Sequence, residues 1–279
     1  MNILQFTGVI ALGSFAAGFL GSITGLGGGV VIVPMLALAL GVDVRYAIGA
    51  SLVSVIATSS GAAAAYVKEG FSNIRIGSFL EIATSFGALV GAFLATRLPT
   101  TAIGVIFGFV LLYSAFQAIS GKAEHAASFG SSDPLARRLK MEGVYPGDHG
   151  PVRYHVRAAP IGFGLMTVAG ILSGLLGIGS GAVKVIAMDQ VMGIPFKVST
   201  ATSNFMIGVT AAASAGIYLS RGYIDPGLAM PVMLGVLAGS ALGARFLTTA
   251  RTPFLRKIFA AAISVLALEM IYNSLTGRL

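Results

Sequence analysis

Two glycine clusters, 152 residues apart, could bind an anion through their backbone N–H groups. They read Thr24-Gly25-Leu26-Gly27-Gly28-Gly29 and Gly177-Ile178-Gly179-Ser180-Gly181. Glycine lets the chain leave helical geometry and present its N–H groups, and a helix that starts directly afterwards adds unpaired N–H donors and a partial positive charge. Two such helix starts that meet inside a membrane would form an oxyanion site. The alternative is that these glycines only allow helices to pack closely.

Polar side chains near both clusters could complete such a site. Lys184 lies three residues after Gly181 in an apolar segment, where a cation is costly and is therefore a functional candidate. It could neutralise a bound anion, or it could reach an interface or pair with Asp189. Hydroxyl and amide groups can hydrogen-bond sulfonate or carboxylate oxygens. Such groups lie near the start of the next segment in both halves: Ser51 in the first half, and Thr200, Ser203 and Asn204 in the second. Hydrogen bonding between helices is the alternative role of each.

Two carboxylates, Glu81 and Asp189, also lie within apolar segments. An intramembrane carboxylate can relay a proton and so couple anion movement to a proton gradient. For Glu81, the alternative is a structural ion pair or an interfacial position near Arg75.

Enzymatic chemistry has little support in the sequence. The chain has no cysteine, and its three histidines, His125, His149 and His155, all lie in one polar stretch. Neither glycine cluster is followed by the Gly-Lys-Ser/Thr of a phosphate-binding loop. We therefore expect no catalytic activity, no cofactor and no metal site.

The composition predicts that a lipid bilayer surrounds the elements that carry these residues. Of 279 residues, 56% are hydrophobic and 10% are charged, and the mean hydropathy is +0.89. Soluble domains have about 25% charged residues, so a soluble fold is excluded, and disorder is excluded by the apolar content. The net charge of +8 fits the cytoplasmic face of a membrane protein, and we expect no nucleic-acid partner.

Ten apolar segments are expected to form helices. They cover residues 3–23, 30–41, 46–66, 75–97, 100–120, 158–176, 182–193, 198–219, 224–247 and 254–274. Segments 30–41 and 182–193 are short for the roughly 20 residues of a spanning helix, so they either cross the membrane or re-enter it. Ten crossings place 13 of the 18 basic residues on one side. The positive-inside rule therefore favours ten crossings and a cytoplasmic stretch 121–157.

The offset of 152 residues extends beyond the glycine clusters. Without a gap it also pairs Gly18 with Gly170 and Gly41 with Gly193, which indicates a duplication. Five crossings in each half would give the halves opposite orientations, as in many secondary transporters. We expect an all-α polytopic membrane protein with two inverted repeats, 1–120 and 158–279, joined by the linker 121–157. The G-x-x-x-G motifs at 87–91 and 239–243 could pack the halves together or form a dimer seam.

These motifs resemble those of the TauE/SafE family of sulfite and organosulfonate exporter-like permeases. The resemblance rests on Gly-Phe-Leu-Gly-Ser-Ile-Thr-Gly-Leu-Gly-Gly-Gly at 18–29, on Gly49-Ala50-Ser51, on Gly-Leu-Leu-Gly-Ile-Gly-Ser-Gly at 174–181 and on Ser199-Thr200-Ala201-Thr202-Ser203. It covers nearly the whole chain except 121–157. It implies a permease for small anions, with sulfite and organosulfonates such as sulfoacetate as substrates, in a prokaryotic inner membrane. Two features depart from the pattern: Ser180 stands where the first cluster has Gly28, and the linker is long.

The sequence thus predicts a secondary transporter that moves a small sulfur oxyanion by alternating access. The glycine breaks would hold the oxyanion, Lys184 would neutralise it, and the Ser/Thr/Asn group would orient it. The alternatives are an anion channel lined by the same residues, an intramembrane enzyme and a purely structural membrane scaffold. The expected partners are the anion, the bilayer and a possible second copy in a homodimer.

Overall fold

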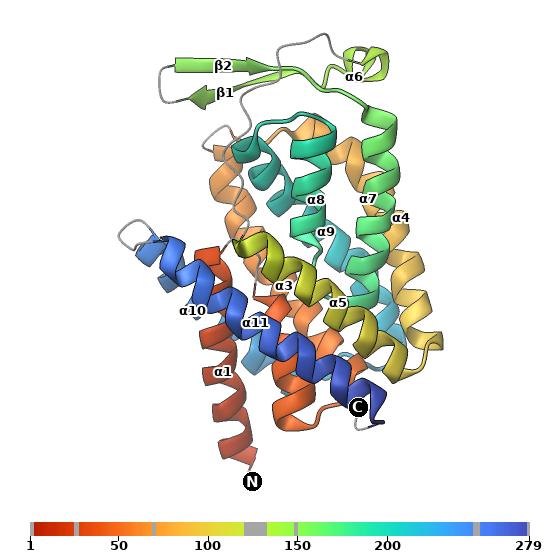
Figure 1. Ribbon diagram of the computed structural model, residues 1–279, viewed down its shortest axis with the longest axis vertical. Coiled ribbons are helices and arrows are strands. Elements are labelled where there is room, and N and C mark those ends of the chain that lie inside the picture. The colour runs from red at the N-terminus through yellow and green to blue at the C-terminus, as the bar shows by residue number, and fades with distance from the viewer. Residues whose placement is uncertain are drawn as a thin grey trace.

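Helices dominate the computed structural model, which describes residues 3–24, 28–68, 71–119, 133–147, 150–247 and 252–277 (Figure 1). The first half contains α1 (Ile3–Thr24), α2 (Gly29–Pro34), the π-helical η1 (Met35–Ala39), α3 (Val44–Lys68), α4 (Ile74–Arg97) and α5 (Thr100–Ile119). The second half contains α7 (Ala159–Leu176), α8 (Gly181–Ile186), the π-helical η2 (Ala187–Val191), α9 (Phe196–Ser220), α10 (Pro226–Leu247) and α11 (Thr252–Leu275). Between them lie α6 (Pro134–Arg138), β1 (Gly143–Gly147) and β2 (Gly150–Tyr154).

All ten expected apolar segments are helical, and their bounds lie within two residues of the expected ones when α2–η1 and α8–η2 are each taken as one helix. Local signals set several of these ends. Asn73 accepts hydrogen bonds from the backbone of Arg75 and Ile76 at the start of α4. Asp225, 152 residues later, accepts one from Gly227 at the start of α10. Such side-chain caps satisfy N–H groups that a helix start leaves unpaired.

The two short helices share one construction. Each runs as α-helix and then as a π turn, over 29–39 and 181–191. Each ends at a glycine with positive φ, Gly41 (63°) and Gly193 (68°). The N–H of the next residue donates to a carbonyl six residues back, from Val42 to Leu36 at 3.0 Å and from Ile194 to Met188 at 2.9 Å. This bond is one residue longer than that of a Schellman cap, because each helix ends in a π turn. Eleven residues rise about 16 Å, or about half of the hydrocarbon thickness of a bilayer.

The packing of the helices repeats with the same offset. α2–η1 and α3 become α8–η2 and α9 when 152 is added to their bounds. α1 packs against α10, as α7 packs against α4, while α3 packs on α9 and α5 on α11. A Cβ at Gly87 would collide with the Thr167 carbonyl, and a Cβ at Gly239 with the Phe15 carbonyl. Gly87 and Gly239, the first glycines of the two G-x-x-x-G motifs, therefore pack one half against the other.

The outer surface of the helices carries large apolar side chains. Leu12 is 73% exposed, Phe86 63% and Phe116 67%. Among the described residues, α4 and α7 are the two helices long and apolar enough to cross a membrane by length and composition alone. Apolar surface of this extent is typical of helices that face lipid.

The linker contains more structure than a solvated loop. β1 and β2 form an antiparallel hairpin with Gly143 opposite Tyr154, and Figure 1 shows it at the end of the molecule where α7 begins. Asp133 accepts hydrogen bonds from the N–H groups of Leu135 and Ala159, and so caps α6 and ties it to α7. His155 lies 3.5 Å from Glu142, whereas His125 and His149 lie outside the described residues.

Candidate substrate-binding site

The two glycine breaks lie against each other. Gly29, the first residue of α2, and Gly177, which ends α7, are both buried. A Cβ added to Gly29 would lie 3.4 Å from the Gly177 carbonyl oxygen and 2.9 Å from Ser51 Oγ. Ser51 Oγ donates a 2.8 Å hydrogen bond to the same carbonyl. The structure thus joins one break of each half through a buried serine of the first half.

Part of the first glycine break lies outside the residues that the structure describes. Gly25, Gly27 and the side chain of Thr24 are not among the described groups. Gly28 is buried, and its carbonyl accepts hydrogen bonds from the N–H groups of Val31 at 3.1 Å and Ile32 at 3.2 Å. Gly28 is therefore the residue from which α2 starts.

Three residues of the second break have positive φ. Gly177 and Gly179 have φ of 67° and 74°, and Ser180 has φ of 45°. The left-handed region is uncommon for a residue with a Cβ. Ser180 Oγ donates a 2.7 Å hydrogen bond to the Ala169 carbonyl of α7. In this conformation the Ser180 hydroxyl therefore stabilises the turn before Gly181.

The polar residues of α9 pack along α8. Ser203 Oγ lies 3.4 Å from the Gly181 carbonyl, to which it donates, and Asn204 Nδ2 donates to the Thr200 carbonyl at 3.1 Å. Thr200 Oγ1 is buried and has no hydrogen-bond partner among the described residues. A buried hydroxyl without a partner costs about 1–3 kcal/mol, so this atom could gain by meeting a polar ligand.

Lys184 is fully buried, with 0% exposure, and does not reach an interface. Its Nζ donates a 2.6 Å hydrogen bond to Thr210 Oγ1 of α9. Thr210 Oγ1 lies 2.8 Å from Glu81 Oε1 of α4, and Ser85 Oγ donates to the same oxygen at 2.8 Å. Two residues that the sequence suggested for separate roles thus belong to one buried network.

Sequence reasoning missed Thr210 and Ser85. Thr210 follows Ser203 by seven residues, and Ser85 follows Glu81 by four. Both spacings place the pair on one helix face, and this periodicity was the signal that could have identified them. Asp189 lies half-buried in η2, and its suggested part in proton coupling stays a prediction.

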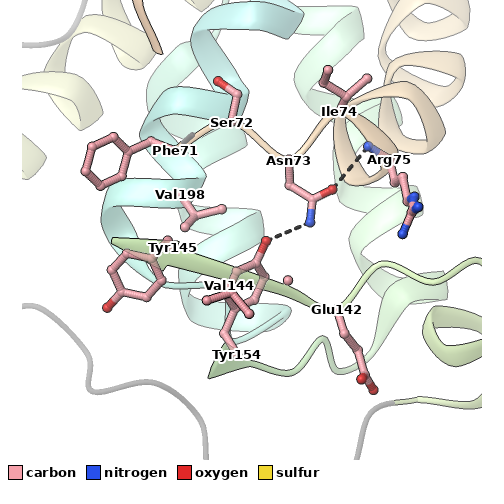
Figure 2. A pocket seen from close by; sticks show the side chains of 11 residues that line it. Phe71, Ser72, Asn73, Ile74, Arg75, Glu142, Val144, Tyr145, Tyr154 and Val198 are labelled. Carbon is pink, nitrogen blue, oxygen red and sulfur yellow. Dashed lines mark hydrogen bonds between the residues drawn. The ribbon is translucent and has the colours of Figure 1, made fainter. Parts of the chain in front are cut away.

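Two cavities lie outside this cluster. One of about 380 Å³ is largely apolar and is lined by α1, α2, η1 and α11, including Glu269. The other, of about 260 Å³, lies between the start of α4 and the hairpin (Figure 2). Figure 2 shows Asn73 pointing at Tyr154, whose Oη lies 2.6 Å from Asn73 Nδ2. Burial raises the pKa of Tyr154 above its ordinary value, and the Asn73 hydrogen bond opposes that rise.

Comparisons with known proteins agree with a membrane location. The chain is 28% identical over 281 residues to the "Probable membrane transporter protein YunE" of Bacillus subtilis (strain 168), covering 98% of this chain and 99% of that protein. It is 25% identical to the "Probable membrane transporter protein YdhB" of the same organism, over 85% of this chain and 89% of that protein. The "Probable membrane transporter protein ORF9" of Sinorhizobium sp is 24% identical, over 97% and 93% of the two chains.

No solved structure matches the chain. The family described as "Sulfite exporter TauE/SafE" matches residues 10–270. This match extends from α1 into α11 and includes both glycine breaks. The chain therefore belongs to the sulfite exporter TauE/SafE family.

Proposed function

We propose that this protein is a secondary transporter that moves a small sulfur-containing oxyanion, sulfite or an organosulfonate such as sulfoacetate, by alternating access. Membership in the TauE/SafE family and the relatives named as probable membrane transporters support transport as its function. The observation that carries the proposal is the contact between the two glycine breaks through Gly29, Ser51 and Gly177. Paired broken helices at corresponding positions are a feature of transporter substrate sites.

An inverted relation between the halves would supply the two conformations. The shared offset and the reciprocal packing of α1 on α10 and α7 on α4 support a two-fold relation. In Figure 1, α1 begins at one end of the molecule and α7 at the opposite end. Two halves of similar structure but opposite direction can exchange conformations and so open the site to either side.

The substrate would displace hydrogen bonds that the protein now makes with itself. Ser51, Ser180 and Ser203 each donate to a backbone carbonyl, so we take this conformation as one with the site closed. On opening, the N–H groups of the glycine breaks would hold the oxyanion. Lys184 would neutralise its charge, and Ser51, Thr200, Ser203 and Asn204 would orient it.

We also propose a membrane location and an orientation for the chain. The excess of basic residues on one side supports a prokaryotic inner membrane with residues 121–157 in the cytoplasm. Glu81 and Asp189 are the proposed sites of proton coupling. A homodimer is the proposed assembly.

Binding and flux measurements test this function. Detergent-purified protein is heated with sulfite, sulfoacetate, taurine, sulfate, thiosulfate or acetate, because a ligand of the folded state raises the melting temperature. We expect stabilisation by one or more sulfur oxyanions and none by acetate. Proteoliposomes should then show saturable uptake and counterflow of that ligand, whereas large unitary currents would instead indicate a channel. No stabilisation and no flux with any sulfur oxyanion would contradict the proposal.

A further inference from the structure

The membrane body contains one buried cation and one buried anion among the residues that the structure describes. Lys184 is 0% exposed and Glu81 is 8% exposed, and the other buried polar residues of that part of the chain are serines and threonines. Lys184 belongs to α8 of the second half, and Glu81 belongs to α4 of the first half. The two charges balance each other across the boundary between the halves.

Thr210 is the side chain between the two charges. Its Oγ1 accepts a hydrogen bond from Lys184 Nζ at 2.6 Å and lies 2.8 Å from two acceptors, Glu81 Oε1 and the Met206 carbonyl oxygen. A threonine hydroxyl has one proton, so it donates to one of these acceptors at a time. Thr210 can therefore point its proton at an ionised Glu81 or turn it toward Met206.

The Glu81 carboxylate has one oxygen that makes no hydrogen bond with the described residues and can accept a proton. Its Oε1 accepts from Ser85 and Thr210, whereas its Oε2 is buried without a partner among the described residues. A protonated carboxyl group carries one O–H donor, and Oε2 is the Glu81 oxygen on which that proton can be placed without displacing a hydrogen bond. Once a proton is bound, rotation of the carboxyl group lets the new O–H donate to Thr210 Oγ1, while the Thr210 hydroxyl turns to the Met206 carbonyl.

The charged and titratable groups of the surrounding elements lie elsewhere. α7 contains no titratable residue, and α9 contains Lys197, which is exposed, and Tyr218, which donates to the Gly174 carbonyl. η2 contains the half-buried Asp189. On α4 itself, Arg75 and Arg97 lie near the two ends of the helix. Within these elements, the buried charges of Lys184 and Glu81 therefore neutralise each other, with Thr210 between them.

We propose, building on the function proposed above, that this network couples the entry of one proton to the entry of one monovalent oxyanion. In the empty state, ionised Glu81 balances the Lys184 ammonium. In the loaded state, a proton from the water on the entry side forms an O–H bond on Glu81, and the anion takes over as the counter-charge of Lys184. On the exit side the O–H bond breaks, the proton returns to water, and Glu81 balances Lys184 again.

The net charge of the site explains why proton entry and anion entry are coupled. The site is neutral when empty and neutral when it holds one proton and one monovalent anion. An anion without a proton, or a proton without an anion, leaves one uncompensated charge in a low-dielectric interior, which costs several kcal/mol. Exchange between the two sides is therefore restricted to the two neutral states, and transport is electroneutral. Hydrogensulfite and monosulfonates fit this charge, whereas sulfoacetate, which carries a sulfonate and a carboxylate, has one negative charge too many.

Methanesulfonate, a monovalent sulfonate, is the probe for a direct test. Proteoliposomes containing the full chain receive a proton gradient of one pH unit or an imposed membrane potential, and the uptake of labelled methanesulfonate is measured together with internal pH. We expect the proton gradient to drive about tenfold accumulation at equilibrium, with one proton entering for each anion and no effect of the potential. Sulfoacetate, with its second negative charge, should not accumulate under the proton gradient, so the coupling proposal narrows the proposed substrates to monovalent oxyanions.

Variants test whether Glu81 and Thr210 couple proton entry to anion entry or only stabilise the fold. Glu81→Gln should retain methanesulfonate exchange between equal pools but lose accumulation driven by the proton gradient. Thr210→Val should flatten the pH profile of uptake, and Thr210→Ser should restore it. Glu269→Gln, an exposed glutamate on α11, serves as the matched control and should behave like the wild type.

The possible failures are distinguishable. Uptake that follows the potential rather than the proton gradient, or proton-driven accumulation that survives Glu81→Gln, would overturn the coupling proposal and leave oxyanion transport intact. No flux of any sulfur oxyanion through the wild-type protein would overturn the proposed function itself, and the coupling proposal with it. A Glu81→Gln protein that melts like the wild type but exchanges no methanesulfonate would also contradict the assigned role of Glu81.

Discussion

The Ser51 hydroxyl donates a 2.8 Å hydrogen bond to the Gly177 carbonyl oxygen. This bond connects α3 of the first half to the end of α7 in the second. Both residues are buried, so the carbonyl has no water to replace Ser51. A movement that separates α3 from the second glycine break must break this bond.

Ser51→Ala should lower the free energy of unfolding by about 1–3 kcal/mol, because it leaves the buried Gly177 carbonyl without this donor. The measurement is the midpoint of thermal unfolding in detergent. Ser60→Ala is the matched control, since Ser60 is an exposed serine of the same helix, and it should leave the midpoint nearly unchanged. Equal midpoints for the two variants would show that the bond contributes nothing.

Gly29→Ala should abolish or strongly reduce oxyanion uptake. The added Cβ would lie 2.9 Å from both Ser51 Oγ and Val55 Cγ2 of α3, so the start of α2 would have to move away from α3 and the Ser51 hydroxyl would be displaced. Gly216→Ala on α9 is the control, because a Cβ there meets nothing within 4 Å and alanine favours a helix. Wild-type uptake by Gly29→Ala would contradict the assignment of the substrate site.

Lys184→Met should destabilise the fold by about 3–5 kcal/mol, because it leaves the Glu81 charge buried without its counter-charge. The double variant Lys184→Met with Glu81→Gln should regain much of that loss. Unfolding midpoints of the four proteins form a double-mutant cycle that measures the coupling. Additive effects of the two substitutions would show that the residues do not interact.

Asn73→Ala should loosen the hairpin from α4. It removes the donor to the Tyr154 hydroxyl and to the Met141 carbonyl, together with the cap of α4. We expect the stability to fall by about 1–2 kcal/mol and proteolysis within 121–157 to become faster. Ser220→Ala, which changes an exposed serine at the end of α9, is the control. Unchanged proteolysis would indicate that other contacts hold the hairpin.

High pH should also loosen the hairpin, because it forms a phenolate at the buried Tyr154. Burial raises the pKa of Tyr154 in the folded state above its ordinary value of 10.0. The neutral phenol therefore contributes stability that is complete below about pH 10 and is lost as the pH rises through the folded-state pKa. Tyr154→Phe should remove this alkaline loss, as followed by proteolysis of the linker between pH 8 and pH 11. The same alkaline loss in Tyr154→Phe would assign it to another group.

The helices were predictable because hydropathy and caps are local signals. The breaks at Gly29 and Gly177 and the offset of 152 residues were readable for the same reason. Thr210 was not, because a threonine in an apolar helix is usually one more hydrogen-bonding side chain. Its role depends on Lys184 and Glu81, which arrive from two other helices. The hairpin at 143–154 was also missed, since both of its five-residue strands contain glycine and proline and therefore carry a weak signal.

The reciprocal packing of α1 on α10 has a consequence for synthesis. α1 is made before its partner α10, which begins at Pro226, so α1 lies in the lipid without this partner until α10 has left the ribosome. The partner of α4 is synthesised much sooner, because α7 follows directly after the linker. A nascent chain that stops before α10 exposes the helix surface that Gly18 offers to Val236, and this uncovered face would distinguish an unfinished protein from a complete one.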